Sequence, residues 1–114
     1  MKQFEIWMAN LEPAFGAEPG KVRPVVIVQS DLLNSLNPSS AIICPITTKI
    51  VSGKYLRINI PANSCGLIEG SDIMIDQIRA IDIRRLKKYI GSLPGSIQEL
   101  IKENLNIVLD LNDK

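Results

Sequence analysis

The amino-acid sequence opens with a two-residue alternation of apolar and polar side chains. Residues 4–11 follow this alternation, and one face would carry Phe4, Ile6 and Met8. This is the period of a β-strand, in which successive side chains point to opposite faces. Trp7 falls on the other face, where it would need cover from a second layer of the protein or from a partner subunit.

Short apolar runs rich in β-branched residues recur along the chain and predict further strands. The runs cover residues 25–29, 41–47, 55–60, 71–75, 77–81 and 89–93. Pro45 lies inside the second run and predicts an edge position or a bulge there, because proline has no N–H to donate to a strand ladder. Single helical turns are expected at residues 30–36, capped by Ser30 or Asp31, and at residues 82–86.

The clearest helix is predicted at the C-terminal end. Ser96 and Glu99 have the spacing of a capping box just after Pro94 and Gly95. Apolar residues then recur on one helical face, namely Ile97, Leu100, Ile101, Leu105, Val108 and Leu109. This helix should pack on the sheet or line a dimer interface. The pattern therefore predicts one mainly β (α+β) domain over residues 1–114, with a strongly bent antiparallel sheet closed by a C-terminal helix.

The composition adds an expectation about assembly. Hydrophobic residues make up 46% of the 114 positions and the mean hydropathy is +0.13, which is apolar for a small protein. Because small domains bury a limited fraction of their surface, part of this apolar content would lie between subunits, and we expect a homodimer. No apolar run could span a bilayer and the first residues begin no signal peptide, so we expect a cytoplasmic protein with no membrane contact.

Residue usage excludes several kinds of chemistry. The chain has no histidine and two cysteines that form no CxxC motif, which excludes the usual zinc sites and histidine-based catalysis. No metal or other cofactor is expected. The net charge is only +1, but five basic residues opposed by a single acid fall within ten positions: Arg79, Arg84, Arg85, Lys87 and Lys88. Such a cluster is either a solvated face or a surface that follows a phosphate backbone.

A loop rich in glycine and proline carries an acid and two bases into the second predicted strand. Glu18, Lys21 and Arg23 lie in this stretch, and Pro24 confines Arg23 to an extended conformation. Arg23 is either a solvated junction residue or a functional group mounted where a loop meets a rigid strand.

With these elements placed, the sequence resembles the MazF/PemK/Kid family of toxin endoribonucleases. The segments that carry the resemblance are Glu5-Ile6-Trp7, residues 18–28 around Arg23-Pro24-Val25, Pro45-Ile46-Thr47-Thr48, and residues 76–82. The resemblance implies an SH3-like β-barrel of the CcdB/PemK/MazF type with a C-terminal helix. It also implies a homodimer that cleaves single-stranded mRNA without a metal and is blocked by a cognate antitoxin.

The resemblance assigns catalysis to Arg23 and Thr47. Cleavage by the 2′-hydroxyl of the RNA needs stabilisation of charge around a crowded phosphate, which a planar guanidinium and a short hydroxyl can supply. Assisted proton removal would need Glu18, Asp76 or water, because arginine stays protonated. Glu18 has the better claim, since some family members use a glutamate there; its alternative is a solvated loop acid.

Further residues are candidates for RNA binding, and some positions depart from the family pattern. The candidates are Phe15, Lys21, Thr48, Lys49, Asp76, Gln77 and Arg79. Phe15 could instead plug its loop onto the barrel, and Gln77 with Arg79 could form a polar rim that holds the strands. The Kid-like arginine two residues before the acid is Met74 here, and the histidine before the loop glutamate is Ala17. These departures weaken a Kid-type acid–base scheme.

Two other functions stay open at this point. One is a non-enzymatic poison that binds DNA gyrase or another protein target, as CcdB does on the same fold, and the other is a degenerate or solely regulatory member. Fold alone does not separate them, because function resides in the site. The pairing of Arg23 with Thr47 favours the enzyme.

Overall fold

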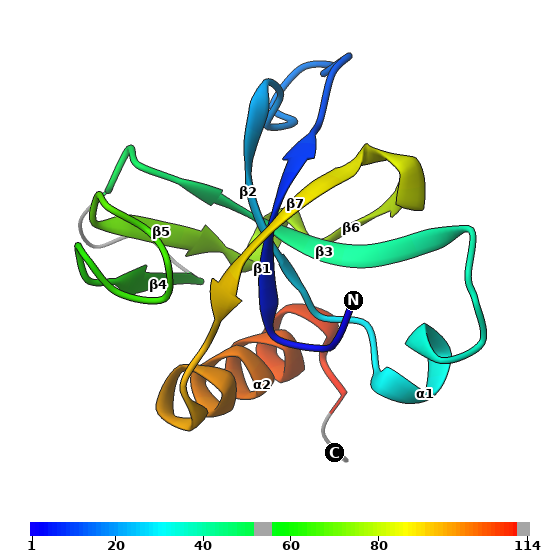
Figure 1. Ribbon diagram of the computed structural model, residues 1–114. Helices are drawn as coiled ribbons and strands as arrows, with labels where there is room; N and C mark the ends of the chain where they lie inside the picture. Colours follow the sequence, from blue (N-terminus) through cyan, green and yellow to red (C-terminus); the bar gives the residue numbers. More distant parts are fainter. Residues whose placement is uncertain (52–55, 112–114) are drawn as a thin grey trace.

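The computed structural model describes residues 1–51 and 56–111 as a bent antiparallel sheet with one long helix (Figure 1). The strands of these residues are β1 (Glu5–Asn10), β2 (Val22–Ile27), β3 (Ser40–Thr47), β4 (Arg57–Ile60), β5 (Ser71–Met74), β6 (Arg79–Asp82) and β7 (Leu86–Ser92). The helices are α1 (Asp31–Asn34) and α2 (Gly95–Leu109), with 3₁₀ turns η1 (Ile75–Gln77) and η2 (Ile83–Arg85). The predicted mainly β fold with a C-terminal helix is confirmed.

The sheet is organised around β3. Its strand order is β4-β5-β3-β2-β1-β7, and β6 pairs with the first half of β3 while β5 pairs with its end. Figure 1 shows β3 crossing the molecule between α1 and the β4–β5 hairpin, which lie on opposite sides. Within the described ranges, the pairings leave β4 and β7 as ends, so the bent sheet does not close into a complete barrel.

The expected edge position for Pro45 is wrong, because β3 is a central strand. Pro45 is buried and faces Val25 of β2. The carbonyls of Ile42 and Ile46 point toward β2, so the alternation of a strand directs the Pro45 backbone nitrogen the other way. On that side the partner of β3 changes from β6 to β5 between Ile43 and Ile46. A residue without an N–H is therefore tolerated inside the sheet.

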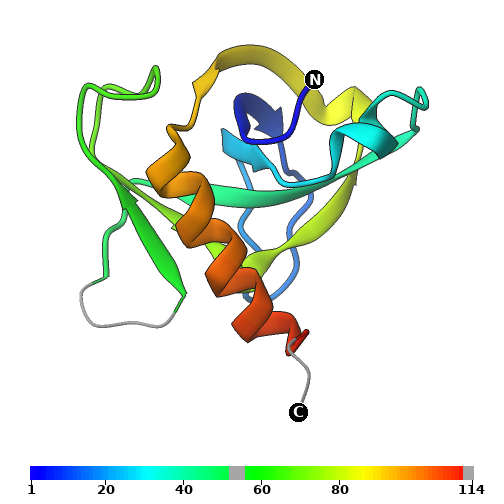
Figure 2. The same ribbon diagram turned by 90° about the horizontal axis from the view of Figure 1, so that it is seen from below.

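Two apolar clusters cover the two faces of the central strands. The larger cluster joins buried residues of the sheet to Ile101 of α2, which is fully buried. Figure 2 shows α2 running across one face of the sheet. The expectation that α2 packs on the sheet is confirmed, although Leu100 and Leu109 of its predicted apolar face stay 45% and 48% exposed. Trp7 packs against the second cluster and lies edge-on to Tyr89 at 6.0 Å between ring centroids. Its cover therefore comes from the same chain.

The predicted capping box of α2 is wrong, since the helix begins before Ser96. Pro94 is the N-cap, and its carbonyl accepts from the amides of Ile97 and Gln98 at 3.1 and 3.0 Å. Ser96 thus falls inside the first turn, and Glu99 pairs with Lys102 at 3.2 Å instead. Proline suits this place because its fixed φ leads into a helix and its missing N–H is not needed there.

The short turns were predicted correctly, and several strand limits differ. Ser30 caps α1 by accepting from the Leu33 amide at 3.4 Å, and η2 falls within the expected turn. β2 begins at Val22 rather than at residue 25, and η1 separates the two extended pieces around residue 76. Tyr55, the first residue of the fourth expected strand, lies outside the described residues. Neither described helix has the length and apolar character to cross a bilayer.

Candidate functional site

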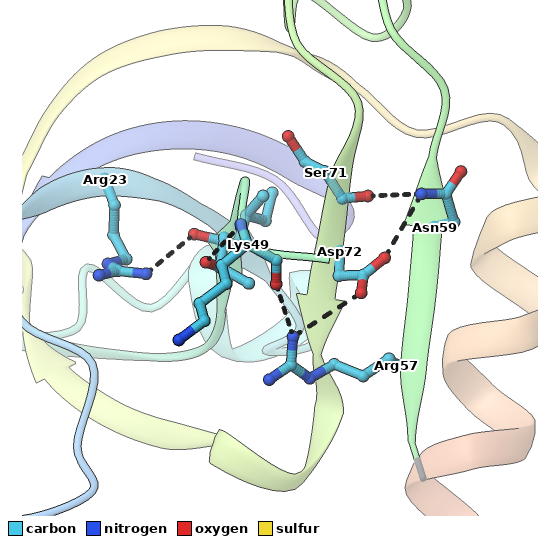
Figure 3. Close-up of polar contacts among 8 residues, drawn as sticks. Arg23, Lys49, Arg57, Asn59, Ser71 and Asp72 are labelled. Carbon is cyan, nitrogen blue, oxygen red and sulfur yellow. Dashed lines mark hydrogen bonds and ion pairs between the residues drawn. The ribbon is translucent and has the colours of Figure 1, made fainter. Parts of the chain in front are cut away.

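Arg23 is mounted inside β2, opposite Ala9 of β1, and its side chain is tied on two sides. Its Nε donates to the Gly20 carbonyl at 2.7 Å, and Nη1 donates to the Ile46 carbonyl at 3.5 Å. Figure 3 shows the guanidinium reaching toward the end of β3. These bonds fix the plane of the half-buried guanidinium and leave the rest of its fork of donors for a ligand.

A cavity of about 370 Å³ lies between the start of β2 and the end of β3. It is lined by Lys21, Val22, Arg23, Pro24, Ile46, Thr47, Thr48 and Lys49. In the part of the chain that the structure describes, these lining side chains offer cations and hydroxyls but no carboxylate, thiol or imidazole. The donor set therefore suits an anion such as a phosphate, and five predicted site residues meet here.

Thr47 ends β3 and lines this cavity. Its Oγ1 accepts a hydrogen bond from the Lys49 amide at 3.1 Å, which shapes the turn that follows the strand. The hydroxyl hydrogen stays free to point at a ligand, because this bond uses only an oxygen lone pair. Stiffness at χ1 of a β-branched residue keeps the hydroxyl in place.

A polar network supports the turn after Thr47, and the sequence patterns did not single it out. Arg57 donates to the Lys49 carbonyl at 3.4 Å, and its Nη1 lies 3.7 Å from Asp72 Oδ2. Asp72 is 3% exposed and also accepts from Asn59 at 3.4 Å (Figure 3). A buried carboxylate needs such partners. The sequence feature that could have indicated this network is Asp72, a charged residue within an apolar strand run.

Glu18 is not among the residues that line the cavity. Its Oε2 is 3.4 Å from Nη1 of Arg79 on β6, with side chains 43% and 25% exposed. That nitrogen is buried and forms no aligned hydrogen bond within the described residues, so the ion pair with Glu18 is its main electrostatic contact. The structure thus joins two predicted site residues to each other, outside the cavity that holds Arg23.

Three other predicted site residues also lie outside the cavity. Phe15 projects from the β1–β2 loop and is 71% exposed. Asp76 is exposed on η1, followed by half-buried Gln77.

Burial, and secondarily the negative charge of Asp76, raises the pKa of the Cys44 thiol to about 12. Cys44 therefore stays protonated in the core, as expected for a structural cysteine.

The base of the β1–β2 loop is held by Arg85 and by the side chain of Glu12, which belongs to the loop itself. Arg85 of η2 donates to the carbonyls of Asn10, at 3.0 Å, and Glu12. The Glu12 carboxylate in turn accepts from the Lys21 amide. A Cβ at Gly20 would lie 2.8 Å from both Ala14 Cβ and Glu12 Oε1, so only glycine fits there. Contacts within the loop therefore position the Gly20 carbonyl that anchors Arg23, and Arg85 holds the strand end from which the loop starts.

A second cavity, of about 300 Å³, collects part of the basic cluster but offers little to an anion. It is lined by Asn10, Asp82, Arg84, Arg85 and Lys87. Arg84 makes a two-pronged contact with Asp82, and its hydrogen bonds lower the pKa of that carboxyl to about 2. Arg85 is already bonded to the loop carbonyls. In this cavity, most of the cationic donors are thus engaged.

Comparison with known proteins agrees with this geometry. The chain is 36% identical to endoribonuclease EndoA of Bacillus subtilis (strain 168) over 114 residues, which is 99% of this chain and 97% of that protein. MazF from Deinococcus radiodurans has a TM-score of 0.83 at 20% identity, covering 97% of both chains. An endoribonuclease in complex with its cognate antitoxin, from a mycobacterial species, has a TM-score of 0.79 at 16% identity, covering 100% of this chain and 99% of that one.

The two solved structures establish the shared fold, and the sequence match establishes the family. Residues 2–109 match the family described as PemK-like, MazF-like toxin of type II toxin-antitoxin system. The resemblance inferred from four short segments is thereby confirmed, and the chain belongs to the PemK/MazF family of toxins.

Proposed function

We propose that this protein is the toxin of a type II toxin–antitoxin system and acts as an endoribonuclease on single-stranded mRNA. The observation that carries the proposal is the cavity in which the Arg23 guanidinium and the Thr47 hydroxyl stand among lysines. A relative of nearly the same length, 36% identical, is named an endoribonuclease. Inhibition of translation and growth would follow from cleavage of mRNA in the cytoplasm.

The reaction would be an intramolecular displacement at phosphorus. The 2′-oxygen forms a bond to phosphorus, the bond from phosphorus to the 5′-oxygen breaks, and the products are a 2′,3′-cyclic phosphate and a 5′-hydroxyl. Negative charge grows on the non-bridging oxygens, and preorganised donors from Arg23 and Thr47 would stabilise it. Lys21 and Lys49 would add positive potential to the cavity and hold the flanking phosphates. Since these donors neutralise the charge themselves, we expect cleavage to need no metal or other cofactor.

In this scheme, water removes and supplies the protons. The carboxylates of Glu18 and Asp76 do not line the cavity, and Glu18 faces Arg79. We therefore assign Glu18 to holding the loop, with removal of the 2′-hydroxyl proton by water and protonation of the leaving 5′-oxygen by water. Phe15, Gln77 and Arg79 would contact the part of the RNA that extends beyond the cavity.

Regulation would come from a cognate antitoxin that covers this surface. One structural neighbour is an endoribonuclease bound to its cognate antitoxin. We propose the same class of partner here, together with a homodimer. A CcdB-like gyrase poison is not favoured, because the matching family is that of PemK-like and MazF-like toxins.

Incubation of the purified protein with a long single-stranded RNA in EDTA tests this function. The wild type should give discrete fragments with 5′-hydroxyl ends. Arg23→Ala should lower the cleavage rate by at least about 100-fold, as expected for loss of a transition-state donor. Thr47→Ala should slow cleavage with little loss of RNA binding. Arg84→Ala is the matched control, because Arg84 is exposed and paired with Asp82.

Two outcomes would contradict the assignment. Intact RNA with a wild-type protein that still arrests growth would indicate a binding poison instead of a nuclease. Equal losses of binding and cleavage in Thr47→Ala would make Thr47 a binding residue.

A further inference from the structure

An apolar cleft of about 260 Å³ continues directly from the cationic cavity. The two share Pro24 and Thr48 in their walls. Beyond these residues the cleft is lined by the apolar side chains of Met8, Leu67, Ile68 and Ile90. A ligand that places a phosphate beside Arg23 would therefore meet an apolar surface one step away.

The outer wall of this cleft is the loop between β4 and β5, and it is packed against β7 by backbone contact. A Cβ at Gly66 would lie 2.3 Å from the Ile90 carbonyl oxygen, and one at Gly91 would lie 2.3 Å from the Cys65 carbonyl oxygen. Gly66 also has φ +83°, which an L side chain rarely adopts. Both glycines are thus needed for the close approach. The cleft wall is fixed before any ligand arrives.

The loop also presents one polar group at the cleft. Exposed Glu69 lines it, and its backbone carbonyl accepts from buried Ser71 Oγ at 2.9 Å. Ile68 lies next to it and is 81% exposed, although its side chain is large and apolar. An exposed isoleucine beside a carboxylate, on a rigid wall, offers a platform with a hydrogen-bond acceptor at its edge.

We propose that this cleft binds a nucleobase of the RNA that flanks the scissile phosphate, an inference that rests on the proposed nuclease function. The base would lie on Ile68 and Leu67, since a base buries its apolar faces when it leaves the stack. The Glu69 carboxylate accepts hydrogen bonds but donates none, so it would favour a base that turns an exocyclic amino group toward it over uracil, which would turn its O4 carbonyl oxygen toward the same point. The cleft is then a specificity site next to the catalytic cavity.

Cleavage-site mapping tests the proposal with three variants. A pool of single-stranded RNA with random sequence is cut, and the bases around every 5′-hydroxyl end are read. The wild type should prefer an amino-bearing base at one flanking position. Ile68→Ala should lower kcat/KM by about tenfold and weaken that preference, while Glu69→Gln should admit uracil, because an amide also donates. Ile42→Ala is the control, since Ile42 is 37% exposed on β3 and lines neither the cavity nor the cleft.

Binding separates this inference from the nuclease function. An RNA that carries a 2′-deoxynucleotide at the cut position binds without being cleaved, and its Kd should rise in Ile68→Ala but not in Ile42→Ala. If the wild type cleaves no RNA, the nuclease function fails, and the Kd of the two variants for the unmodified single-stranded RNA still decides on the cleft. Unchanged preference and Kd in both cleft variants would overturn the base site. Conversion of a dimer to monomers by Ile68→Asp would assign this face to a second copy of the chain and also overturn it.

Discussion

At the scale of single residues, the role of Glu18 separates two mechanisms. Its carboxylate faces Arg79 at 3.4 Å and does not line the cavity of Arg23. A general base would contribute about 100- to 10,000-fold to the rate, whereas a partly exposed ion pair contributes little to stability, about 0–1 kcal/mol. We therefore propose the second role for Glu18.

Glu18→Gln should therefore lower the cleavage rate by less than about tenfold, because it removes only a surface ion pair. Arg79→Gln should have an effect of similar size, and the double variant should lose no more than either single one. The pH profile is the sharper readout. A carboxylate base works only when deprotonated, so activity would fall as the pH falls through its pKa, and glutamine would remove that limb. An acid limb that persists in Glu18→Gln excludes Glu18 as the base, whereas loss of the limb with a 100-fold slower reaction would reinstate it.

Sequence motifs found the residues of the cavity but not the direction of every side chain. Arg23 and Thr47 lie at strand ends within short motifs, so strand pairing alone brings them together. Glu18 lies in a loop whose base is bonded to Arg85, a residue far from it in sequence. A loop acid could therefore be recognised, but not its partner Arg79.

At the scale of elements, the β1–β2 loop is positioned by a series of hydrogen bonds that ends at Arg23. Arg85 bonds the carbonyl of Asn10 at the end of β1. The Glu12 carboxylate accepts from the Lys21 amide just before the start of β2. Lys21 has φ +68°, a conformation that costs a non-glycine residue free energy and persists only when neighbours enforce it. The Gly20 carbonyl then receives Arg23 Nε at 2.7 Å. The ordered loop therefore fixes the position of the Arg23 guanidinium.

Arg85→Ala should reduce cleavage by about tenfold or more, since its charged hydrogen bonds contribute about 1.5–3 kcal/mol. Arg84→Ala should leave cleavage unchanged, because the neighbouring arginine contacts Asp82 rather than the loop. Hydrogen exchange at the Lys21 amide reports the loop independently of activity. Glu12→Ala should speed that exchange, and Glu12→Gln, which keeps an acceptor oxygen, should restore protection. Equal cleavage by the two arginine variants would show that the loop orders itself without Arg85.

Sequence periodicity predicted where the strands and helices lie better than which elements lie beside them. The two-residue alternation located β1 and an apolar run located β3, but nothing local to Pro45 shows that β3 changes partner from β6 to β5 beside it. The start of α2 shows the same limit. Ser96 and Glu99 satisfy the local capping rule, yet the Pro94 carbonyl takes the first helical bonds because the chain enters α2 directly from β7.

At the scale of the whole molecule, a considerable apolar surface stays outside both core clusters. Leu32 and Leu36 around α1 are 74% and 67% exposed, and Ile107 on α2 is 64% exposed. Contiguous apolar patches on small proteins mark interaction sites, and a symmetric dimer is the commonest way to cover one. The three residues lie on two separate parts of the fold, so they define two candidate interfaces.

Sedimentation at micromolar concentration should therefore give a species of twice the chain mass of 12.6 kDa. Leu36→Asp and Ile107→Asp place a charge in each candidate interface, and burying an unpaired carboxylate there would cost several kcal/mol. The substitution that yields monomers identifies the interface, and the other serves as its control. A wild-type protein that sediments as a monomer would contradict the dimer. Because RNA cleavage by the monomeric variant can then be measured, the same pair of proteins also shows whether the cavity of Arg23 is complete within one chain.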